Sequence, residues 1–330
     1  MHLNVFVSQS CFLHCKGCYS FSREEEKGKI VSTDNLIKFL EFAHSVGVDK
    51  ITLCGGDPLT RSDIIDLLEK IKKIGFNISL DTVGTSILND VVCGDRVIAK
   101  KTDAKKIANL VDTIGIPIDG STNEIFRRFR QTNTDIINQQ MKICQELHRF
   151  GGNICINTVA HKGNLEDVYS LAMLIKNMGF INKWQIFQYM PMGKFGLKNR
   201  ECFEISEKEF KQFQTEVLKI FDKESEKVQF KDWNKRKNIY MLIDNSGNAW
   251  IPSMEKNDLS NNSYNLNANT IIGNITHPED WTKICEYLDE THIGKLENIT
   301  EKDTNIITLR RGLINLVSNN NELQTIKNMI

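Results

Sequence analysis

Three cysteines stand close together near the start of the chain, in the stretch SQSCFLHCKGCYS at residues 8–20. Cys11, Cys15 and Cys18 have the spacing C-x3-C-x2-C, and the next cysteine is Cys54. A structural zinc site closes its coordination with four ligands, and a ferredoxin-type carrier also uses four thiolates. Three thiolates on a cubane of four irons leave one iron open, much as a catalytic zinc keeps one position for its substrate. The spacing therefore favours an iron-sulfur cluster that binds a ligand.

The elements that must position this loop alternate between strands and helices. Apolar strands are predicted at 3–7, 50–54, 77–80, 113–118, 153–160 and 183–189. Helical periodicity lies between them, at 33–47, 60–75, 104–111, 134–149 and 165–178. Such strands belong in a parallel sheet that helices cover on its outside, and right-handed crossovers curl it toward a barrel. The sequence thus predicts an α/β fold, a partial (β/α)6 parallel barrel, with the cysteine loop at the C-terminal ends of the strands, where such barrels hold their chemistry.

The pattern changes after about residue 200. A polar helix is predicted near 206–222, and a hairpin is predicted around Asn245-Ser246-Gly247. The Asn-rich stretch 257–270 is typical of a loop. We therefore expect two parts, a barrel at 1–200 and a small α+β region at 201–330 that covers the barrel mouth.

Composition excludes several classes of protein. The 330 residues include 42 basic and 42 acidic ones, so no global field favours a nucleic-acid polymer or an anionic membrane. The apolar runs are too short to span a membrane, and the N-terminus lacks the charged and apolar regions of a signal peptide. The chain has nine cysteines, and the six outside the cluster at residues 11–18 stand singly along the sequence. An odd number of scattered cysteines does not indicate a disulfide framework. We expect a cytoplasmic protein.

The cysteine spacing, followed by Tyr19, resembles the cluster signature of the radical S-adenosylmethionine (radical SAM) superfamily. The stretch CGGDPLTR at 54–61 resembles the Gly-Gly-Glu-Pro loop of that family, with Asp57 in place of the usual Glu. The resemblance covers about residues 3–200. It implies one [4Fe-4S] cluster on the three cysteines and SAM as the second cofactor. It also implies that the amino group of SAM is received by the loop formed by Gly55, Gly56, Asp57 and Pro58.

Further positions of the family pattern follow one at a time. In LDTVGT (80–85), the resemblance implies contacts from Asp81 and Thr82 with the amino group or ribose of SAM. In IPIDGS (116–121), Asp119 is similar to a polar residue that hydrogen-bonds nearby ligand groups. In RRFR (127–130), Arg130 is the residue we expect to pair with the SAM carboxylate, because a guanidinium binds carboxylates in a bidentate manner.

One residue departs from the family pattern at the cluster loop. The family usually has an aromatic residue just before the third cysteine, where this chain has Gly17. Tyr19 is then the candidate for contact with the adenine of SAM.

The chemistry that the resemblance implies is carried by the cofactors. One electron from the reduced cluster cleaves SAM to methionine and a 5'-deoxyadenosyl radical, which abstracts a hydrogen atom from the substrate. The protein has to exclude water and oxygen and to hold the substrate close to the radical. We therefore expect an oxygen-sensitive oxidoreductase or lyase that is reduced by a partner such as flavodoxin or ferredoxin.

The first substrate hypothesis is a nucleotide. The stretches INTVAHKGNLEDV, NKWQIFQYMPMG and KNIYMLID resemble viperin-like members, which dehydrate a nucleoside triphosphate. Asn157, Lys237 and Tyr240 match contact residues of those members. Cys155 stands where they have a lysine, and "KWQ" at 183–185 replaces two of their cations around the tryptophan, which weakens a triphosphate site. A nucleotide-like substrate remains indicated.

Two other enzymatic hypotheses and one non-enzymatic hypothesis compete with it. The first is a peptide substrate, because the stretches IDNSGNAWIPS and IIGNITHPEDWTKI resemble the SPASM-type C-terminal regions of enzymes that modify peptides (RiPP maturation). Ser253 stands where those regions have a cluster cysteine, so we predict no auxiliary cluster. Another small metabolite would be met by Asn157, His161, Gln188 and Tyr240. An iron-sulfur redox or electron-transfer protein would use only the cluster. We favour a nucleotide or other small molecule over a peptide.

Overall fold

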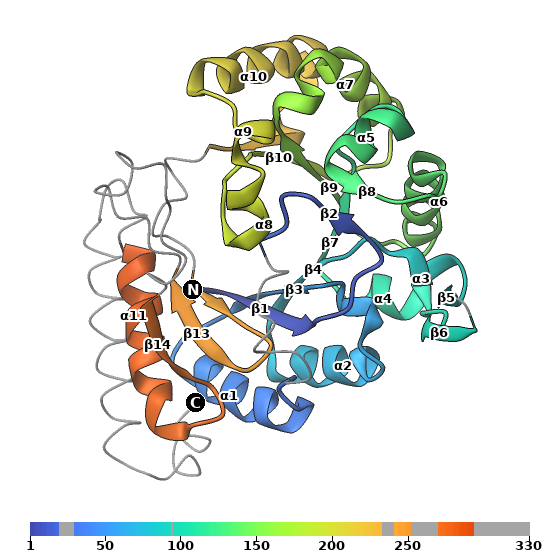
Figure 1. The fold of residues 1–330 in the computed structure, drawn as a ribbon. Coiled ribbons are helices and arrows are strands. Elements are labelled where there is room, and N and C mark those ends of the chain that lie inside the picture. The colour runs from blue at the N-terminus through green and yellow to red at the C-terminus, as the bar shows by residue number, and fades with distance from the viewer. Residues whose placement is uncertain (20–29, 94, 233–240, 252–269, 294–330) are drawn as a thin grey trace.

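The computed structural model describes residues 1–19, 30–93, 95–232, 241–251 and 270–293. Within these residues ten strands form one sheet, in the order β11-β10-β9-β7-β4-β3-β1-β12-β13-β14 (Figure 1). The strands of this sheet are β1 His2–Ser8, β3 Lys50–Gly55, β4 Asn77–Asp81, β7 Thr113–Pro117, β9 Ile154–Ala160, β10 Lys183–Gln188, β11 Val228–Lys231, β12 Leu242–Ile243, β13 Asn248–Ile251 and β14 Thr270–Asn274. Two small sheets pair β2 His14–Cys15 with β8 Arg130–Gln131, and β5 Val91–Cys93 with β6 Arg96–Ala99.

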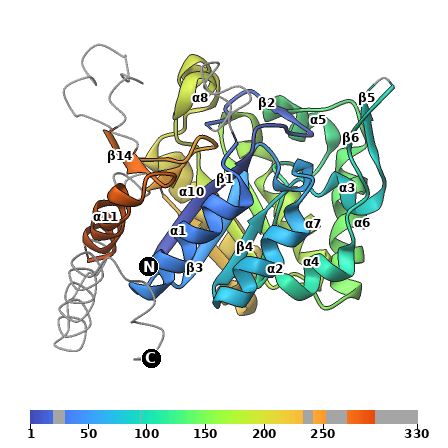
Figure 2. The ribbon, with the colours of Figure 1, turned by 90° about the horizontal axis from the view of Figure 1, so that it is seen from below.

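Helices follow most of these strands. They are α1 Thr33–Ser45, α2 Ile64–Ile74, α3 Thr85–Leu88, α4 Ala104–Leu110, α5 Asn123–Phe129, α6 Ile136–Arg149, α7 Val168–Asn177, α8 Gly193–Lys198, α9 Arg200–Phe203, α10 Glu207–Phe221 and α11 Trp281–Ile293. Figures 1 and 2 show α1, α2, α4, α6, α7 and α10 on the outer side of the curved sheet, whereas α8 lies beside β2. Among the described helices, none is both long enough and apolar enough to cross a membrane.

The six strands predicted from the sequence are β1, β3, β4, β7, β9 and β10. They are neighbours in this order, and each pair is parallel. The α/β fold and the partial parallel barrel are therefore confirmed. The apolar runs of these strands arise because helices cover the outer face, as the burial of Trp184 at 0% exposure against Phe221 of α10 illustrates.

Two further parallel strands extend the barrel beyond the predicted six. β11 pairs with β10 through Trp184 and Val228, and β12 pairs with β1 through Asn4 and Leu242. Of these, β11 is not among the predicted strands. The predicted hairpin joins β12 to β13, and Gly247 supplies the left-handed φ of 87° that its turn needs.

The sheet therefore contains strands from both sides of residue 200. The C-terminal strands β12 to β14 continue the sheet at β1, and α11 packs Trp281 against Phe39 and Phe42 of α1. The division into a barrel at 1–200 and a capping region at 201–330 stays a prediction.

Candidate active site

The three clustered cysteines line one cavity at the C-terminal ends of β1 and β3. Cys11, Cys15 and Cys18 share this cavity of about 360 Å³ with Gly56 of the glycine loop and Phe195 of α8. Among the described residues, no three His, Cys, Asp or Glu side chains are placed to hold a single metal ion. The thiols surround a space rather than meet at a point, so their arrangement fits a multi-iron cluster better than one ion.

Backbone pairing fixes the cysteine loop against the end of α5. The short strand β2 pairs antiparallel with β8, which places Cys15 opposite Arg130. The Lys16 amide donates to the Phe129 carbonyl at 2.9 Å, and the Cys18 amide donates to the Cys15 carbonyl at 3.2 Å. These backbone hydrogen bonds fix the shape of the loop within the protein.

Two donors approach the thiols from the protein side. The Leu13 amide donates to Cys11 Sγ at 3.5 Å, and Arg130 Nη1 donates to Cys15 Sγ at 3.7 Å. Burial raises the pKa of the Cys11 and Cys15 thiols to about 12, so a metal must displace their protons when it binds. The amide and the guanidinium then stabilise the thiolate charge.

The glycine loop touches the cysteine loop backbone to backbone. Gly55 has a left-handed φ of 125°, and a Cβ at Gly56 would lie 2.1 Å from the Ser10 carbonyl oxygen. The Gly56 amide donates to the Ser8 carbonyl at 2.7 Å, and the Asp57 amide donates to the Ser10 carbonyl at 2.6 Å. Glycine is required here because the two segments approach too closely for a side chain.

The Asp57 side chain ties this loop to the end of β4. Its carboxylate is fully buried and accepts hydrogen bonds from Thr82 Oγ1 at 2.7 Å, the Leu59 amide at 2.9 Å and the Val83 amide at 2.6 Å. Burial raises the pKa of Asp57 to about 6, although these donors act in the opposite direction. The side chains of Asp57 and Thr82 are thus bonded to each other, and Gly56 is the loop residue that lines the cavity, while Pro58 begins a buried 3-10 turn.

Arg130 lies between a buried carboxylate and the cysteine loop. Asp119, which follows β7 and is 0% exposed, accepts from Arg130 Nε and from the Val159 amide, the latter at 2.7 Å. Burial opposes the charge of the guanidinium, but Asp119 and Cys15 hold the pKa of Arg130 above its ordinary value. Asp119 and Arg130 therefore form one unit beside the candidate cluster ligand.

An aromatic cluster occupies the space beside Gly17. A Cβ on Gly17 would lie 2.5 Å from the Phe129 ring and 2.7 Å from the Tyr189 ring. His161 stacks on Phe129 at a centroid distance of 4.8 Å and meets Phe203 edge-on at 5.3 Å. Burial lowers the pKa of His161 to about 4, so its imidazole is neutral at neutral pH. Rings from other elements thus fill the place of the missing aromatic side chain.

Replacing Gly17 with phenylalanine should displace the cysteine loop, although it restores the family's usual aromatic residue type. The new ring would overlap the rings of Phe129 and Tyr189, and overpacking a filled core forces backbone shifts. We expect less iron and sulfide per chain after reconstitution, measured by chemical analysis. As a control for strain away from the loop, Gly151→Ala puts a side chain on a backbone with a φ of 80° where a Cβ meets nothing within 4 Å, so it should lower stability without lowering the iron content. Equal iron content in Gly17→Phe and wild type would contradict this packing argument.

Side chains on the inner face of the sheet alternate with those that pack against the helices. On β9, Ile156 is fully buried toward the helices, so Cys155 and Asn157 face inward. Asn157 Nδ2 donates to Asp81 Oδ1 at 2.8 Å. A Cβ on Gly115 would lie 2.1 Å from that same oxygen, so the bare glycine leaves room for this bond across β7.

The inner face also carries cations. Burial raises the pKa of Cys155 to about 12, and the charges of Lys183 and Lys231 partly offset this shift. The pKa of Asp81 is raised to about 6 by burial, against the hydrogen bond from Asn157. Lys231 was missed from the sequence because β11 was missed, although the alternation VQFK at 228–231 is a strand signal.

Gln188 lies apart from this inner face. Its side chain lies on the same face of β10 as those of Trp184 and Ile186, which are fully buried toward the helices. Gln188 Nε2 donates to the Ile205 carbonyl at 3.1 Å. His161 is likewise enclosed by aromatic rings. The structure therefore brings Asn157 to the inner face but neither of these two candidates.

Tyr19 lies against the apolar part of the inner sheet. Its ring centroid is 5.9 Å from that of Phe6, and its side chain hydrogen-bonds Cys54. Lys237 and Tyr240, the other two substrate candidates, lie outside the described residues.

The segment after β10 contacts the cysteine loop and was not singled out from the sequence. Asn199 Nδ2 donates to the Lys16 carbonyl at 2.8 Å, and Tyr189 Oη donates to the Gly196 carbonyl at 2.6 Å. Phe195 and Asn199 line the cysteine cavity. The position of this segment after the sixth strand, at the rim that bears the cysteines, was the available signal.

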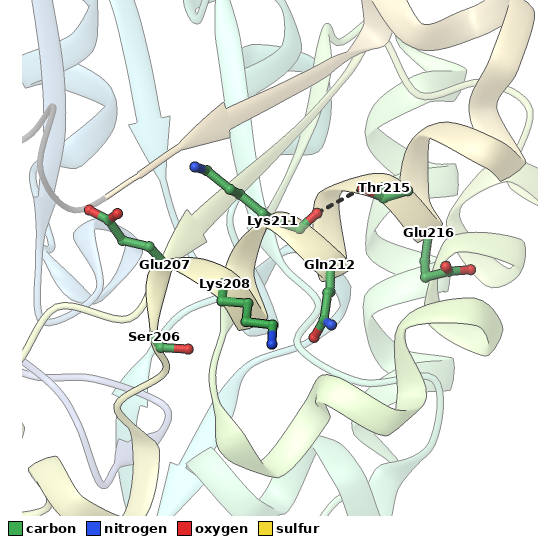
Figure 3. A pocket seen from close by; sticks show the side chains of 7 residues that line it. All are labelled: Ser206, Glu207, Lys208, Lys211, Gln212, Thr215 and Glu216. Atoms are coloured by element: carbon green, nitrogen blue, oxygen red, sulfur yellow. Dashed lines mark hydrogen bonds between the residues drawn. The ribbon is translucent and has the colours of Figure 1, made fainter.

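A second hollow of about 660 Å³ lies along the outer side of α10 (Figure 3). Its lining residues all belong to α10 and its cap: Ser206, Glu207, Lys208, Lys211, Gln212, Thr215 and Glu216. One helix and its mixed charges form the whole lining, and none of the candidate residues is near it in sequence. We assign it no role.

Comparison with known proteins identifies the family of the chain. The family model of the radical SAM superfamily matches residues 5–175. The AdoMet-dependent heme synthase of Methanosarcina barkeri is 25% identical over 188 residues, which are 57% of this chain and 50% of that protein. The GTP 3',8-cyclase of Clostridium perfringens is 28% identical over 223 residues, 64% of this chain and 63% of that protein. The matched region thus spans about half to two thirds of these relatives.

A solved structure shares the fold. Streptococcus suis SuiB bound to S-adenosylmethionine matches with a TM-score of 0.61 and 16% sequence identity, over 91% of this chain and 68% of SuiB. The chain belongs to the radical SAM superfamily, since the family model matches more than half of it. It is therefore an enzyme of a class that implies SAM and an iron-sulfur cluster.

Proposed function

We propose that this enzyme carries one [4Fe-4S] cluster on Cys11, Cys15 and Cys18, cleaves SAM reductively, and abstracts a hydrogen atom from a nucleotide or other small-molecule substrate. The observation that carries the proposal is the single cavity that the three cysteines share with Gly56. It joins the cluster signature to the glycine loop in space, although the two are separated by a strand and a helix in sequence.

When bound, a reduced cluster with SAM supplies the electron that yields methionine and the 5'-deoxyadenosyl radical. The residues of this chain bind and orient SAM. The backbone of the Gly55–Gly56 loop receives the amino group of SAM, because Gly56 lines the cavity that the cysteines share. Asp57 and Thr82 hold that backbone in place through their buried hydrogen bond. Arg130 supplies positive charge beside Cys15 and toward the SAM carboxylate, and Asp119 orients it.

The substrate lies on the inner face of the sheet, near Asp81 and Asn157. These polar side chains face the same side of the sheet and hydrogen-bond each other, so they can exchange that bond for hydroxyl or amide groups of a ligand. Tyr19 provides an aromatic surface for adenine. A nucleotide substrate is supported by the relative whose name states that it acts on GTP. A peptide substrate is the alternative outcome of the test below.

The C-terminal region, residues 201–330, is proposed to cap the substrate site without an auxiliary cluster. Its described cysteines stand on separate elements, with Cys202 exposed on α9 and Cys285 buried on α11. The electron is proposed to come from a reducing partner such as flavodoxin or ferredoxin. Phe195 and Asn199 of the segment after β10 limit access of water and oxygen to the cavity.

The proposal is tested under anaerobic conditions. The protein is reconstituted with iron and sulfide, given SAM and dithionite, and assayed for 5'-deoxyadenosine by mass spectrometry. The assay is run alone and with the four ribonucleoside triphosphates and their nucleosides. We expect slow basal cleavage and stimulation by one compound of the panel.

The outcomes separate the parts of the proposal. Stimulation by a nucleotide would support both the reaction and the substrate class. Basal cleavage that no nucleotide accelerates would keep the reaction and favour a peptide or another metabolite. An intact cluster, verified by its visible absorbance and electron paramagnetic resonance, with no cleavage of SAM would overturn the proposal.

A further inference from the structure

The guanidinium of Arg61, whose side chain is 8% exposed, makes five hydrogen bonds. Its Nε donates to Asp63 Oδ1 at 2.7 Å, and its Nη2 donates to Thr33 Oγ1 at 2.9 Å and to Asp63 Oδ2 at 3.3 Å. Its Nη1 donates to the main-chain carbonyls of Val7 and Val31, each at 3.2 Å. A lysine has three donors and no planar fork, so among the cationic side chains only arginine can make this set of bonds.

The two carbonyls that Arg61 binds lie at the two ends of the segment that carries the cysteines. Val7 precedes the last residue of β1, and Val31 stands two residues before the first residue of α1. Because both carbonyls accept from the same nitrogen, Arg61 holds these two ends together. Joining the ends of a loop removes conformational freedom that the binding of a cluster would otherwise have to remove.

The first of these carbonyls belongs to a β-bulge. The pairing of β1 with β3 is regular as far as Phe6, and it resumes at Ser8, which lies opposite Gly55. Val7 is therefore the extra residue, and a bulge leaves its extra residue out of the ladder. Arg61 thus supplies a donor to the backbone at the bend where the chain turns from the strand into the cysteine loop.

The same stretch of chain fixes the glycine loop. Arg61 ends the 3-10 turn that begins at Pro58, and its amide donates to the Pro58 carbonyl at 3.0 Å. The preceding residue, Thr60, donates from Oγ1 to the Asp57 carbonyl at 2.7 Å, and the same oxygen hydrogen-bonds Ser8 Oγ. One short segment therefore contacts both of the loops that meet at the cysteine cavity.

Asp63 orients this arginine instead of capping a helix. It is the N-cap residue of α2, a position at which an Asp side chain commonly accepts a backbone amide, but it makes no such bond. Both of its carboxylate oxygens accept from Arg61, and Oδ2 also accepts from Thr33 Oγ1. The direction of the guanidinium is thus set by the first residue of α1 and the N-cap of α2.

The C-terminal hairpin contacts the same place. The Val31 amide donates to the Asn245 carbonyl at 2.8 Å, and a Cβ on Gly247 would lie 2.9 Å from Val31 Cγ2. Both backbone groups of Val31 are therefore bonded, one to the turn between β12 and β13 and the other to Arg61. The end of the cysteine segment is held from two sides.

We propose that Arg61 is a positioning residue for cofactor binding, which holds the two ends of the cysteine segment together and fixes the glycine loop against them. Arg61 is not among the residues that line the cavity, so it acts through Gly56 and the three cysteines, which are. The distance between the cluster and the amino group of SAM then depends on its guanidinium fork. This inference rests on the proposed function, since it concerns the site of that reaction.

The first test measures SAM binding rather than turnover, and it compares Arg61→Lys with the wild type. Lysine keeps the charge but cannot reach all four partners with three donors. The dissociation constant of SAM is measured by anaerobic equilibrium dialysis of the reconstituted full-length proteins and is expressed per intact cluster from their iron content. We expect Arg61→Lys to raise it by about tenfold or more, because bonds to both ends of the cysteine segment are weakened. Thr33→Val, which removes one acceptor of the arginine, should raise it by a few-fold.

Two control variants separate positioning from stability. Arg149→Lys makes the same exchange in an exposed pair with Glu146 and should bind SAM as the wild type does. Phe221→Leu should lower the midpoint of thermal unfolding, because it removes part of a buried ring that packs against Trp184 under α10. It touches neither loop, so it should leave the dissociation constant of SAM unchanged.

The second test needs no cofactor. The amides of Gly56 and Asp57 donate to the carbonyls of Ser8 and Ser10, so their hydrogen exchange reports how firmly the two loops are joined. Exchange is followed by mass spectrometry on the cofactor-free protein, in peptides that cover residues 54–60. We expect faster exchange there in Arg61→Lys than in the wild type and in Arg149→Lys.

Each result decides the inference. Weaker SAM binding per cluster together with faster exchange in Arg61→Lys supports it. Equal SAM affinity and equal exchange, even with lowered thermal stability, overturns it, because Arg61 would then only stabilise the fold. A wild-type protein that has an intact cluster and neither binds nor cleaves SAM would overturn the proposed function instead, and the exchange measurement would still decide whether Arg61 joins the two loops.

Discussion

Replacing Cys15 with alanine is expected to reduce 5'-deoxyadenosine formation to background. Three thiols line the cavity, so one substitution leaves two ligands for a cluster that already lacks a fourth protein ligand. Cys15 is also the thiol that receives Arg130 Nη1, so its loss leaves that donor without its sulfur partner. The measurements are iron and sulfide per chain after reconstitution, and 5'-deoxyadenosine formed with dithionite and SAM.

Cys144→Ala is the matched control for this substitution. Cys15 is half-buried at the cavity, whereas Cys144 is fully buried on α6 among the apolar side chains of the core. Its replacement should cost about 1 kcal/mol of stability, as is common for single substitutions, and leave cluster content and cleavage near wild type. If Cys15→Ala forms 5'-deoxyadenosine at the wild-type rate, the cysteine loop does not hold the cluster, and this conclusion does not depend on the control.

The fold was predictable where its signals are local. The six apolar strands are separated by helices whose inward residues repeat every three or four positions, and both patterns follow from burial on the outer face of the sheet. β11 was missed because it is a four-residue strand in the charged stretch KESEKVQFKDWNKRK. The pairing of β12 with β1 joins Leu242 to Asn4, and no local pattern indicates a contact between segments so far apart in sequence.

The site was likewise predictable only where its residues are neighbours in sequence. Cysteine spacing and paired glycines are visible in sequence because the constraint acts on neighbouring residues. The partners of Asp57 and Arg130 were not visible, because Thr82 and Asp119 lie in other loops, just after β4 and β7. The outward direction of Gln188 follows from its even spacing to Trp184, a large apolar side chain that is fully buried toward the helices.

Gly17 illustrates a departure that only the structure explains. In sequence it is the loss of an aromatic side chain beside the third cysteine. In three dimensions the rings of Phe129 and Tyr189 come from α5 and the end of β10 and already lie against its backbone. Residues distant in sequence therefore fill the space beside Gly17.

Arg130→Ala should have the largest effect on stability of any substitution at the site. Asp119 is 0% exposed, and the Arg130 side chain is 17% exposed, so the pair is largely removed from water. Removing one partner of a buried ion pair costs about 3–5 kcal/mol, because the other charge remains buried without compensation. Thermal unfolding of the wild-type and variant proteins measures this loss directly.

The same substitution should also impair cluster assembly. Arg130 Nη1 is the cation beside Cys15 Sγ, and a thiolate without this partner is less stable in its buried position. Arg128→Ala provides the comparison, because Arg128 is half exposed, pairs with Glu124 across one helical turn and donates to the Gly163 carbonyl at 3.0 Å. Exposed contacts of this kind are worth about 1 kcal/mol or less, so their loss should be much smaller than that at Arg130.

A double-mutant cycle with Asp119 separates the ion pair from the cluster effect. If the stability loss comes from an uncompensated carboxylate, Asp119→Asn combined with Arg130→Met should be more stable than Arg130→Met alone. Iron content should remain low in both, since neither restores a cation beside Cys15. An Arg130→Ala protein as stable as Arg128→Ala, with full iron content, would mean that the buried pair holds neither the fold nor the cysteine loop.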